Sequence, residues 1–272
     1  MNHSELQRCD DVTLFMSSLS FLLTDLQSLS AETRRKYPDV RDASDKALSL
    51  LRSAGVESYQ IASGELLKPI FMGCATKNAK VIAIALGSLH RLISMKAVPI
   101  SLVPQTITTM GDAMSQGVDI QLRILQTLLS LITNFPSVNG DKLSEALLLC
   151  FKLHESKIAV VSSTAAATLR QLVMFVVDKM QTETEGADIQ VKLPDGTTQA
   201  MSPASRDAYS VFEDLCLLAN AEKPNFLKLD YLHKTFALEL IESVLTNYHP
   251  LFRSVSLCLS VFSHSDLCST RN

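Results

Sequence analysis

Glycine, proline and tryptophan are scarce in this sequence. Its 272 residues include nine glycines, nine prolines and no tryptophan. Because glycine and proline mark tight turns, their scarcity argues against a sheet protein with many turns and favours long helices joined by short loops. Hydrophobic residues make up 47% of the chain, enough to bury a large core, or several small ones, without disulfide or metal staples. We therefore expect a globular, all-α protein.

Neither sign of charge dominates the sequence. The chain has 25 Lys and Arg against 28 Asp and Glu, a net charge of −3, and the two signs are interspersed. Such a chain has no long-range field that would concentrate nucleic acid or anionic lipid around it. We therefore expect no binding to nucleic acid.

The cysteines show no pattern of a zinc or redox site. No two of them stand in a C-x-x-C spacing, which argues against both a zinc clip and a dithiol redox motif. Buried free thiols in a reducing compartment are the expected state. The cysteines are Cys9, Cys74, Cys150, Cys216, Cys258 and Cys268.

Signals for secretion and membrane anchoring are also missing. The N-terminal stretch lacks the basic region and apolar core of a signal peptide. The longest apolar run, 81–86, is far shorter than the roughly 18 residues that span a bilayer. Asn2 stands where myristoylation needs glycine, and Cys268 is one residue too far from the end for prenylation. We expect a cytoplasmic protein whose membrane attachment comes through partners or through sequence outside this chain.

Apolar residues recur at the spacing of amphipathic helices along most of the chain. In the first such stretch Leu19, Leu22 and Leu26 share one face, and Pro38 ends it. The stretch after Asn78 is apolar on almost every side, so other helices must cover it. The expected helices are 14–36, 39–51, one that begins near 63, 79–93, 99–114, 119–133, 141–153, 157–180, 207–218 and 230–247.

Three of these helices repeat the same apolar positions, at shifts of 39 and 41 residues. This is the length of one HEAT or armadillo hairpin, which hides its apolar face against the next hairpin and leaves an extended surface for partners. The alternative is a compact helical domain without repeats, since leucine-rich helices also align by chance. The aligned sets are Leu89, Leu92 and Ile93, then Leu128, Leu131 and Ile132, then Leu169, Leu172 and Val173.

The helical pattern stops between Gln181 and Arg206, where the chain is polar and rich in turn-forming residues. Within this segment 189–193 alternates, 194–196 is a Pro-Asp-Gly turn, and 197–201 can return as a second strand. A small exposed hairpin is one interpretation, although an isolated two-stranded ribbon is marginally stable. A flexible loop is the other.

Residues with catalytic potential are present but form no known motif. The patterns of nucleotide-binding loops, zinc proteases and serine hydrolases do not occur. His90, His154 and His233 lack acidic or thiol neighbours at ligand spacing. Glu239 and Glu242, three positions apart on a helix, would set two carboxylates side by side for acid–base work, but a solvated helix face explains the same spacing. We expect no cofactor, no metal site and no enzyme activity.

Arg34, Arg35 and Lys36 form a basic triplet at the end of the first expected helix. One interpretation is contact with phospholipid or with the acidic patch of a partner. The other is structural, because positive charge is favourable at any helix C-terminus.

Four segments resemble the N-terminal region of the large Golgi Arf-exchange-factor superfamily, and most closely its Mon-two branch, which is related to Sec-seven but lacks the exchange domain. The expected helix 230–247 has Ala237 where the family commonly has glycine, a change that favours the helix. The segments are 21–53, 65–93, 121–138 and 222–247.

The resemblance implies an armadillo/HEAT-like, right-handed superhelical solenoid of stacked helical hairpins. It also implies a dimerisation and cyclophilin-binding domain at 1–180 and an incomplete start of the domain upstream of the Sec-seven domain at 207–252, with 181–206 between them. Residues 253–272 fit no family pattern, which predicts a truncation or an aberrant gene model.

The implied function is a non-catalytic scaffold module, peripheral on trans-Golgi and endosome membranes, that acts by protein association. The implied partners are a second copy or the protein's own downstream domain, Arf-like small GTPases and a Dopey-type scaffold. Two alternatives are a direct lipid-binding module and a part of an Arf-type exchange factor. The candidate partner-binding residues are Arg34, Arg35, Lys36, Phe236, Glu239 and Glu242.

Overall fold

A computed structural model describes residues 3–53, 59–182, 189–192 and 198–254, with side chains described for 17–53, 64–180, 182, 189–192 and 198–248. The atypical tail expected at 253–272 lies outside these residues from 255 onward, as do Cys258 and Cys268. The side chain of Cys9 and parts of the 181–206 segment, residues 183–188 and 193–197, also lie outside them.

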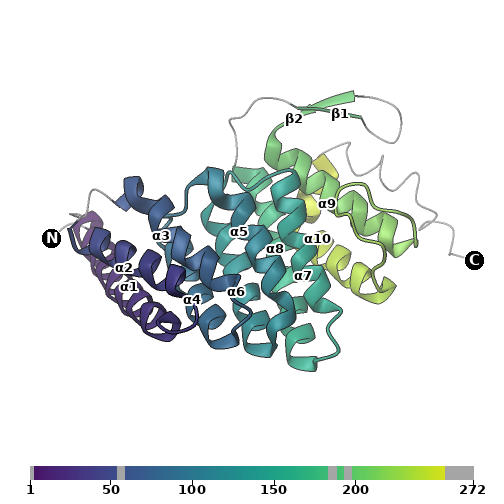
Figure 1. Cartoon of the computed structure of the whole chain (residues 1–272). Coiled ribbons are helices and arrows are strands. Elements are labelled where there is room, and N and C mark those ends of the chain that lie inside the picture. Colours follow the sequence, from purple (N-terminus) through teal and green to yellow (C-terminus); the bar gives the residue numbers. More distant parts are fainter. Residues whose placement is uncertain (1–2, 54–58, 183–188, 193–197, 255–272) are drawn as a thin grey trace, which may run out of the picture. The chain divides into compact units, whose positions relative to one another are not determined.

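The described residues form helix after helix, as the spacing predicts, with a single small strand pair (Figure 1). Two short 3₁₀ helices, Ile100–Leu102 and Met114–Gln116, flank α5. The α-helices are α1 His3–Thr33, α2 Pro38–Ser53, α3 Tyr59–Cys74, α4 Ala79–Ser94, α5 Val103–Ala113, α6 Val118–Asn134, α7 Asp141–His154, α8 Ala159–Thr182, α9 Pro203–Ala219 and α10 Lys234–Ser254.

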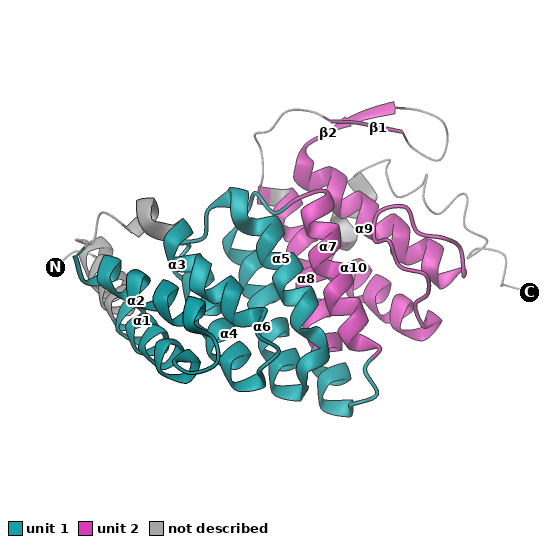
Figure 2. Ribbon diagram, viewed as in Figure 1, with its two compact units in different colours: residues 1–138, 156–164 teal, residues 139–155, 165–272 magenta. Residues whose placement is uncertain are grey.

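The chain divides into two compact units (Figure 2). Unit 1 comprises Met1–Val138 and Ser156–Thr164, and unit 2 comprises Asn139–Glu155 and Ala165–Asn272. The candidate binding residues Arg34, Arg35 and Lys36 therefore belong to unit 1, and Phe236, Glu239 and Glu242 to unit 2.

Unit 1 is a set of helical hairpins packed through their leucine faces. Helix α1 packs on α2 and α4, α2 on α3, α3 on α4, and α4 on α6. Leu22, Leu26 and Leu29 of α1 are at most 1% exposed, because spacings of three and four residues place them on one face of the helix. Asn78 caps the start of α4, because its side chain accepts hydrogen bonds from two backbone N–H groups of the first turn. Its neighbours α1, α3 and α6 supply the cover that its all-round apolar sequence requires.

The repeated apolar positions are equivalent in burial. All nine residues of the three aligned sets, on α4, α6 and α8, are at most 2% exposed. The prediction that these positions face the core in each helix is confirmed.

The turn between α1 and α2 differs from expectation. Helix α1 ends at Thr33, and the basic triplet follows it in the turn rather than lying in its last helical turn. Proline disfavours helical geometry in the residue before it and suits the first position of a helix, so α2 begins at Pro38. The hydroxyl of Tyr37 donates a hydrogen bond to the Thr76 carbonyl at 2.9 Å, which ties the turn to the end of α3.

Unit 2 contains α7, most of α8, the strand pair, α9 and α10. Strand β1, Ile189–Lys192, pairs antiparallel with β2, Thr198–Met201, with Ile189 opposite Met201. Of the two interpretations of this segment, the strand pair is the one observed, and residues 193 and 197 lie outside the described residues. Helix α9 begins earlier than expected, at Pro203, because the Ser202 hydroxyl accepts the Ser205 N–H and caps it.

The loop that joins α9 to α10 is held by a buried carboxylate. Asp214 of α9 accepts backbone N–H groups of Asn225, Phe226 and Leu227 at 2.7, 2.8 and 2.6 Å. The loop also buries Leu227 completely. These contacts fix a non-helical segment, so α10 begins at Lys234 and not at residue 230 as expected.

The described thiols are buried and form no disulfide. Cys74, Cys150 and Cys216 form no disulfide, as predicted. Burial raises the pKa of Cys74 and of Cys150 to about 12, which keeps both thiols protonated and unreactive at neutral pH.

Helix α8 is long and strongly apolar. Its segment Ala159–Met180 has the length and mean hydropathy, 1.5, of a membrane-spanning helix, whereas the longest apolar run in the sequence did not. Within the described residues no other helix meets this test. In the structure 44% of the tested stretch is buried inside the protein, and buried core helices can have the same composition.

Candidate functional site

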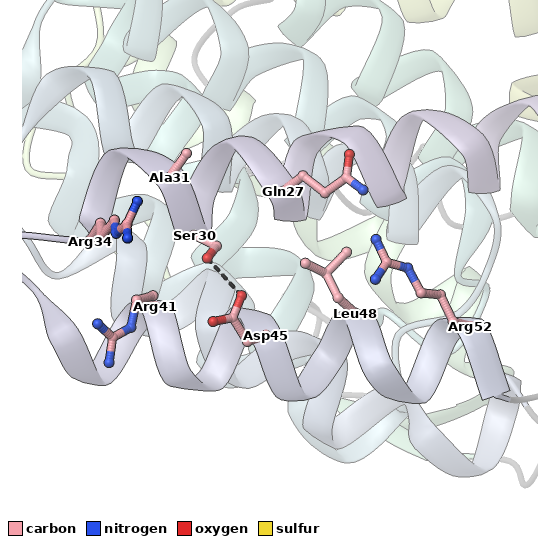
Figure 3. A pocket seen from close by; sticks show the side chains of 8 residues that line it. All are labelled: Gln27, Ser30, Ala31, Arg34, Arg41, Asp45, Leu48 and Arg52. Carbon is pink, nitrogen blue, oxygen red and sulfur yellow. Dashed lines mark hydrogen bonds between the residues drawn. The ribbon is translucent and has the colours of Figure 1, made fainter.

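A shallow groove on unit 1 lies between α1 and α2 (Figure 3). Its volume is about 560 Å³. We call it the α1/α2 groove. It is lined by Gln27, Ser30, Ala31 and Arg34 of α1 and the turn after it, and by Arg41, Asp45, Leu48 and Arg52 of α2.

Helical spacing explains why these residues share the groove. On α2 the buried face carries Val40, Ala47 and Leu51. The groove residues of α2 follow one another at intervals of four, three and four positions, so they form a single stripe beside that face. The two helices thus bury their leucines between them and leave a polar rim above.

Three guanidinium groups dominate the charge of this rim. Arg41 bonds the carboxylate of its neighbour Asp42 at 2.6 Å, and this hydrogen bond, with the charge of Asp42, raises the pKa of Arg41. Asp45 accepts a hydrogen bond from the Ser30 hydroxyl at 2.7 Å, drawn as the dashed line in Figure 3. Arg34 and Arg52 are exposed and form no salt bridge with any residue that the structure describes.

The groove has the chemistry of recognition rather than of reaction. Arginine binds carboxylates and phosphates through paired hydrogen bonds and does not exchange its proton near neutral pH. The lining contains no cysteine, histidine or paired carboxylates. In the described part of the chain no three His, Cys, Asp or Glu side chains come together as a metal site.

Of the predicted basic triplet, only Arg34 lines the groove. Arg35 and Lys36 are exposed in the same turn. The sequence prediction missed Arg41 and Arg52, although their places on one stripe of an amphipathic helix were readable from the spacing. The sequence did not show that this stripe of α2 faces α1.

The second predicted set, on α10, holds unit 2 together. Phe236 is 6% exposed, its ring stacks on His154 of α7 at a centroid distance of 4.0 Å, and the Arg170 guanidinium of α8 lies 5.4 Å from its centroid. Arg170 also pairs with Glu239. Phe236 and Glu239 thus join α10 to α7 and α8, and Glu242 remains on the exposed surface.

The surroundings of His154 in this cluster lower its pKa. Burial lowers its pKa, and the charge of Arg170 acts in the same direction, while Glu155 and Glu239 oppose it. A neutral ring suits its stacking on Phe236.

One exposed aromatic side chain lies outside both predicted sets. Phe21 of α1 is 54% exposed, and the Arg91 guanidinium of α4 lies 4.9 Å from the centroid of its ring. The Nε of Arg91 bonds Asp25 at 2.7 Å. This contact fastens α1 to α4 and leaves one face of an aromatic ring open to solvent.

Two family models match the sequence. The dimerisation and cyclophilin-binding domain of Mon2/Sec7/BIG1-like proteins matches residues 14–184. The HUS domain of Mon2/Sec7/BIG1-like proteins matches residues 204–270.

Similar full-length proteins come from animals and fungi. The chain is 34% identical over 249 residues to a protein MON2 homolog of Xenopus laevis, and equally to one of Homo sapiens, covering 86% of this chain in each case. It is 27% identical over 238 residues to protein MON2 of Saccharomyces cerevisiae, which covers 83% of this chain. In all three cases the aligned region spans 14% of the relative's length.

Proposed function

Because the chain belongs to the Mon2/Sec7/BIG1-like family, we propose that it is a non-catalytic scaffold module of a Golgi–endosome trafficking protein. The match of the dimerisation and cyclophilin-binding domain to residues 14–184 carries the proposal. Neither matched domain is a catalytic exchange domain. The arginine-lined groove can bind a ligand but has no reactive groups, which fits a protein that acts by binding partners.

The proposed partners are proteins. They are a second copy of the chain or the downstream domain of its own protein, Arf-like small GTPases and a Dopey-type scaffold. The proposed location is the cytoplasmic face of trans-Golgi and endosome membranes, with peripheral attachment through these partners. The domain name of the family, dimerisation and cyclophilin-binding, supports protein partners in general.

The proposed architecture is an armadillo/HEAT-like, right-handed superhelix of stacked hairpins. Residues 1–180 would form the dimerisation and cyclophilin-binding domain, and residues 207–252 the start of the upstream homology domain. The equivalent burial of the three aligned leucine sets supports stacking, because each hairpin then hides the apolar face of its neighbour. An exposed surface along such a stack would carry the partner contacts.

Light scattering and pull-down assays test the association proposal. We expect either a mass above that of the monomer or capture of an Arf-like GTPase, a Dopey-type scaffold or the downstream part of a MON2 relative. A nucleotide-release assay on the same GTPase serves as the functional control, and we expect no acceleration. A strictly monomeric chain that binds none of these partners would overturn the proposal.

Direct lipid binding is a second candidate, favoured by the exposure of the basic triplet in the turn after α1. Anionic headgroups attract such exposed cations. Flotation with anionic liposomes would compare the wild type with the triple variant Arg34→Ala, Arg35→Ala, Lys36→Ala. Equal flotation of both proteins, or none of either, would rule out this use of the triplet.

A further inference from the structure

The cations of the α1/α2 groove lie at its two ends. Figure 3 shows Arg34 and Arg41 at one end, Arg52 at the other, and Ser30, Asp45 and Leu48 between them. Arg41 and Arg52 stand eleven positions apart on α2, which is about 16 Å at a helical rise of about 1.5 Å per residue. The groove is therefore a polar channel with positive charge at both ends.

The end cations are available for a ligand. Arg34 and Arg52 are exposed and form no salt bridge within the described residues. Arg41 uses its Nε and one terminal nitrogen on Asp42, and its guanidinium has further N–H groups. Asp45, in the middle, is already engaged by the Ser30 hydroxyl.

This arrangement selects among anionic ligands. A single phosphorylated headgroup is too small to reach both ends and would meet the carboxylate of Asp45 between them. A flat anionic bilayer would also meet Asp42, whose side chain is 64% exposed. No large apolar side chain in the lining is exposed for insertion, because Leu48 is only 6% exposed. A peptide segment with two separated carboxylates can reach both ends, needs no apolar insertion and does not spread over Asp42.

We propose that the α1/α2 groove binds an acidic segment of a partner protein, with one carboxylate at Arg34 and Arg41 and another at Arg52. The inference rests on the proposed function, since it names the partner chemistry of an association module. A helical segment places two glutamates at this distance when they are eleven residues apart. An extended segment does so when they are about five residues apart. Guanidinium–carboxylate pairs at each end then set position and direction.

Fluorescence anisotropy with a labelled synthetic peptide tests the inference. The probe is an alanine-rich helical peptide with two glutamates eleven positions apart, and the matched control peptide carries glutamine at both places. We expect saturable binding of the glutamate peptide that weakens as salt is added, with at least tenfold weaker binding of the glutamine peptide.

Variants of the full chain locate the site. Arg34→Ala and Arg52→Ala should each weaken binding about fivefold to tenfold. Arg123→Ala, which removes an exposed arginine of α6 outside the groove, should leave it unchanged. Circular dichroism checks that each variant is folded. Equal binding of the two peptides, or wild-type binding by Arg34→Ala and Arg52→Ala, would overturn the inference.

Two further comparisons separate this inference from membrane binding and from the proposed function. If the wild-type chain floats with anionic liposomes, Arg34→Ala and Arg52→Ala do not, and the glutamate peptide does not bind, the ligand is a membrane and the inference is wrong. If the wild-type chain associates with protein partners while the groove variants associate equally well, the groove inference fails and the proposed function stands. If the wild-type chain binds no protein at all, the proposed function fails.

Discussion

Removal of the Asp214 carboxylate should open the loop between α9 and α10. The side chain is fully buried and accepts three backbone N–H groups, from Asn225, Phe226 and Leu227. A hydrogen bond to a charged group contributes about 1.5–3 kcal/mol, and a buried donor left without a partner costs a similar amount. Water can reach the exposed Asn225 after the substitution, so that bond is discounted.

The two remaining bonds give the expected magnitude. Asp214→Ala should lower the free energy of unfolding of unit 2 by about 3–6 kcal/mol. Asp214→Asn keeps one acceptor oxygen for Phe226 and Leu227 and should lose less. Asp230→Ala removes an exposed carboxylate in the same loop and should change stability by no more than about 0.5 kcal/mol.

Urea denaturation and amide hydrogen exchange measure this effect. The loss of stability should come with fast exchange of the Leu227 amide, which donates a hydrogen bond to Asp214 in the wild type and should exchange slowly there. The reasoning is refuted if Asp214→Ala costs less than about 1 kcal/mol, or if the Leu227 amide stays protected in the variant. Either result would mean that the leucines of the loop, and not the carboxylate, hold it in place.

Three further outcomes follow from the packing of unit 2 and from the buried thiols. Phe236→Ala should cost about 3–5 kcal/mol in urea denaturation because it empties a packed aromatic site, whereas Leu238→Ala, at a 37% exposed position on the same helix, should cost much less. Because burial lowers the pKa of His154, the unfolded chain binds a proton at this residue more readily than the folded chain. The free energy of unfolding should therefore stay constant above a pH of about 6.5 and fall as the pH drops below it. His154→Phe should keep the ring stacking and reduce that fall, as a pH series of denaturation curves would show; an unchanged slope would contradict it. Cys74 and Cys150 should resist a thiol reagent in the native protein and react after denaturation, and rapid labelling of either in the native protein would contradict their burial.

The helices and their repeats were predictable because they depend on local spacing. The apolar positions of α4, α6 and α8 follow the 3.6-residue period, and a period survives in any sequence whose helix buries one face. The strand pair was predictable for the same local reason, since alternation and a Pro-Asp-Gly turn are short-range signals.

Features that depend on distant partners were not predictable. The start of α10 is set by Asp214, on another helix, and no local signal connects that carboxylate to the N–H groups of the loop. The apolar spacing of its helix places Phe236 with Leu240 and Val244 on one face, but it does not show what that face contacts. The partners of Phe236 and Glu239, His154 and Arg170, come from helices far away in sequence. The α1/α2 groove likewise exists only because α2 folds back on α1, which brings Arg34 and Arg52 to a common recess.

Binding of a purified protein partner tests the central claim, that the chain works by association and not by turnover. An Arf-like GTPase loaded with a fluorescent nucleotide would be titrated with the wild-type chain while anisotropy and nucleotide release are followed together. The account predicts a saturable rise in anisotropy with an unchanged release rate. Accelerated release without a saturable complex would contradict it.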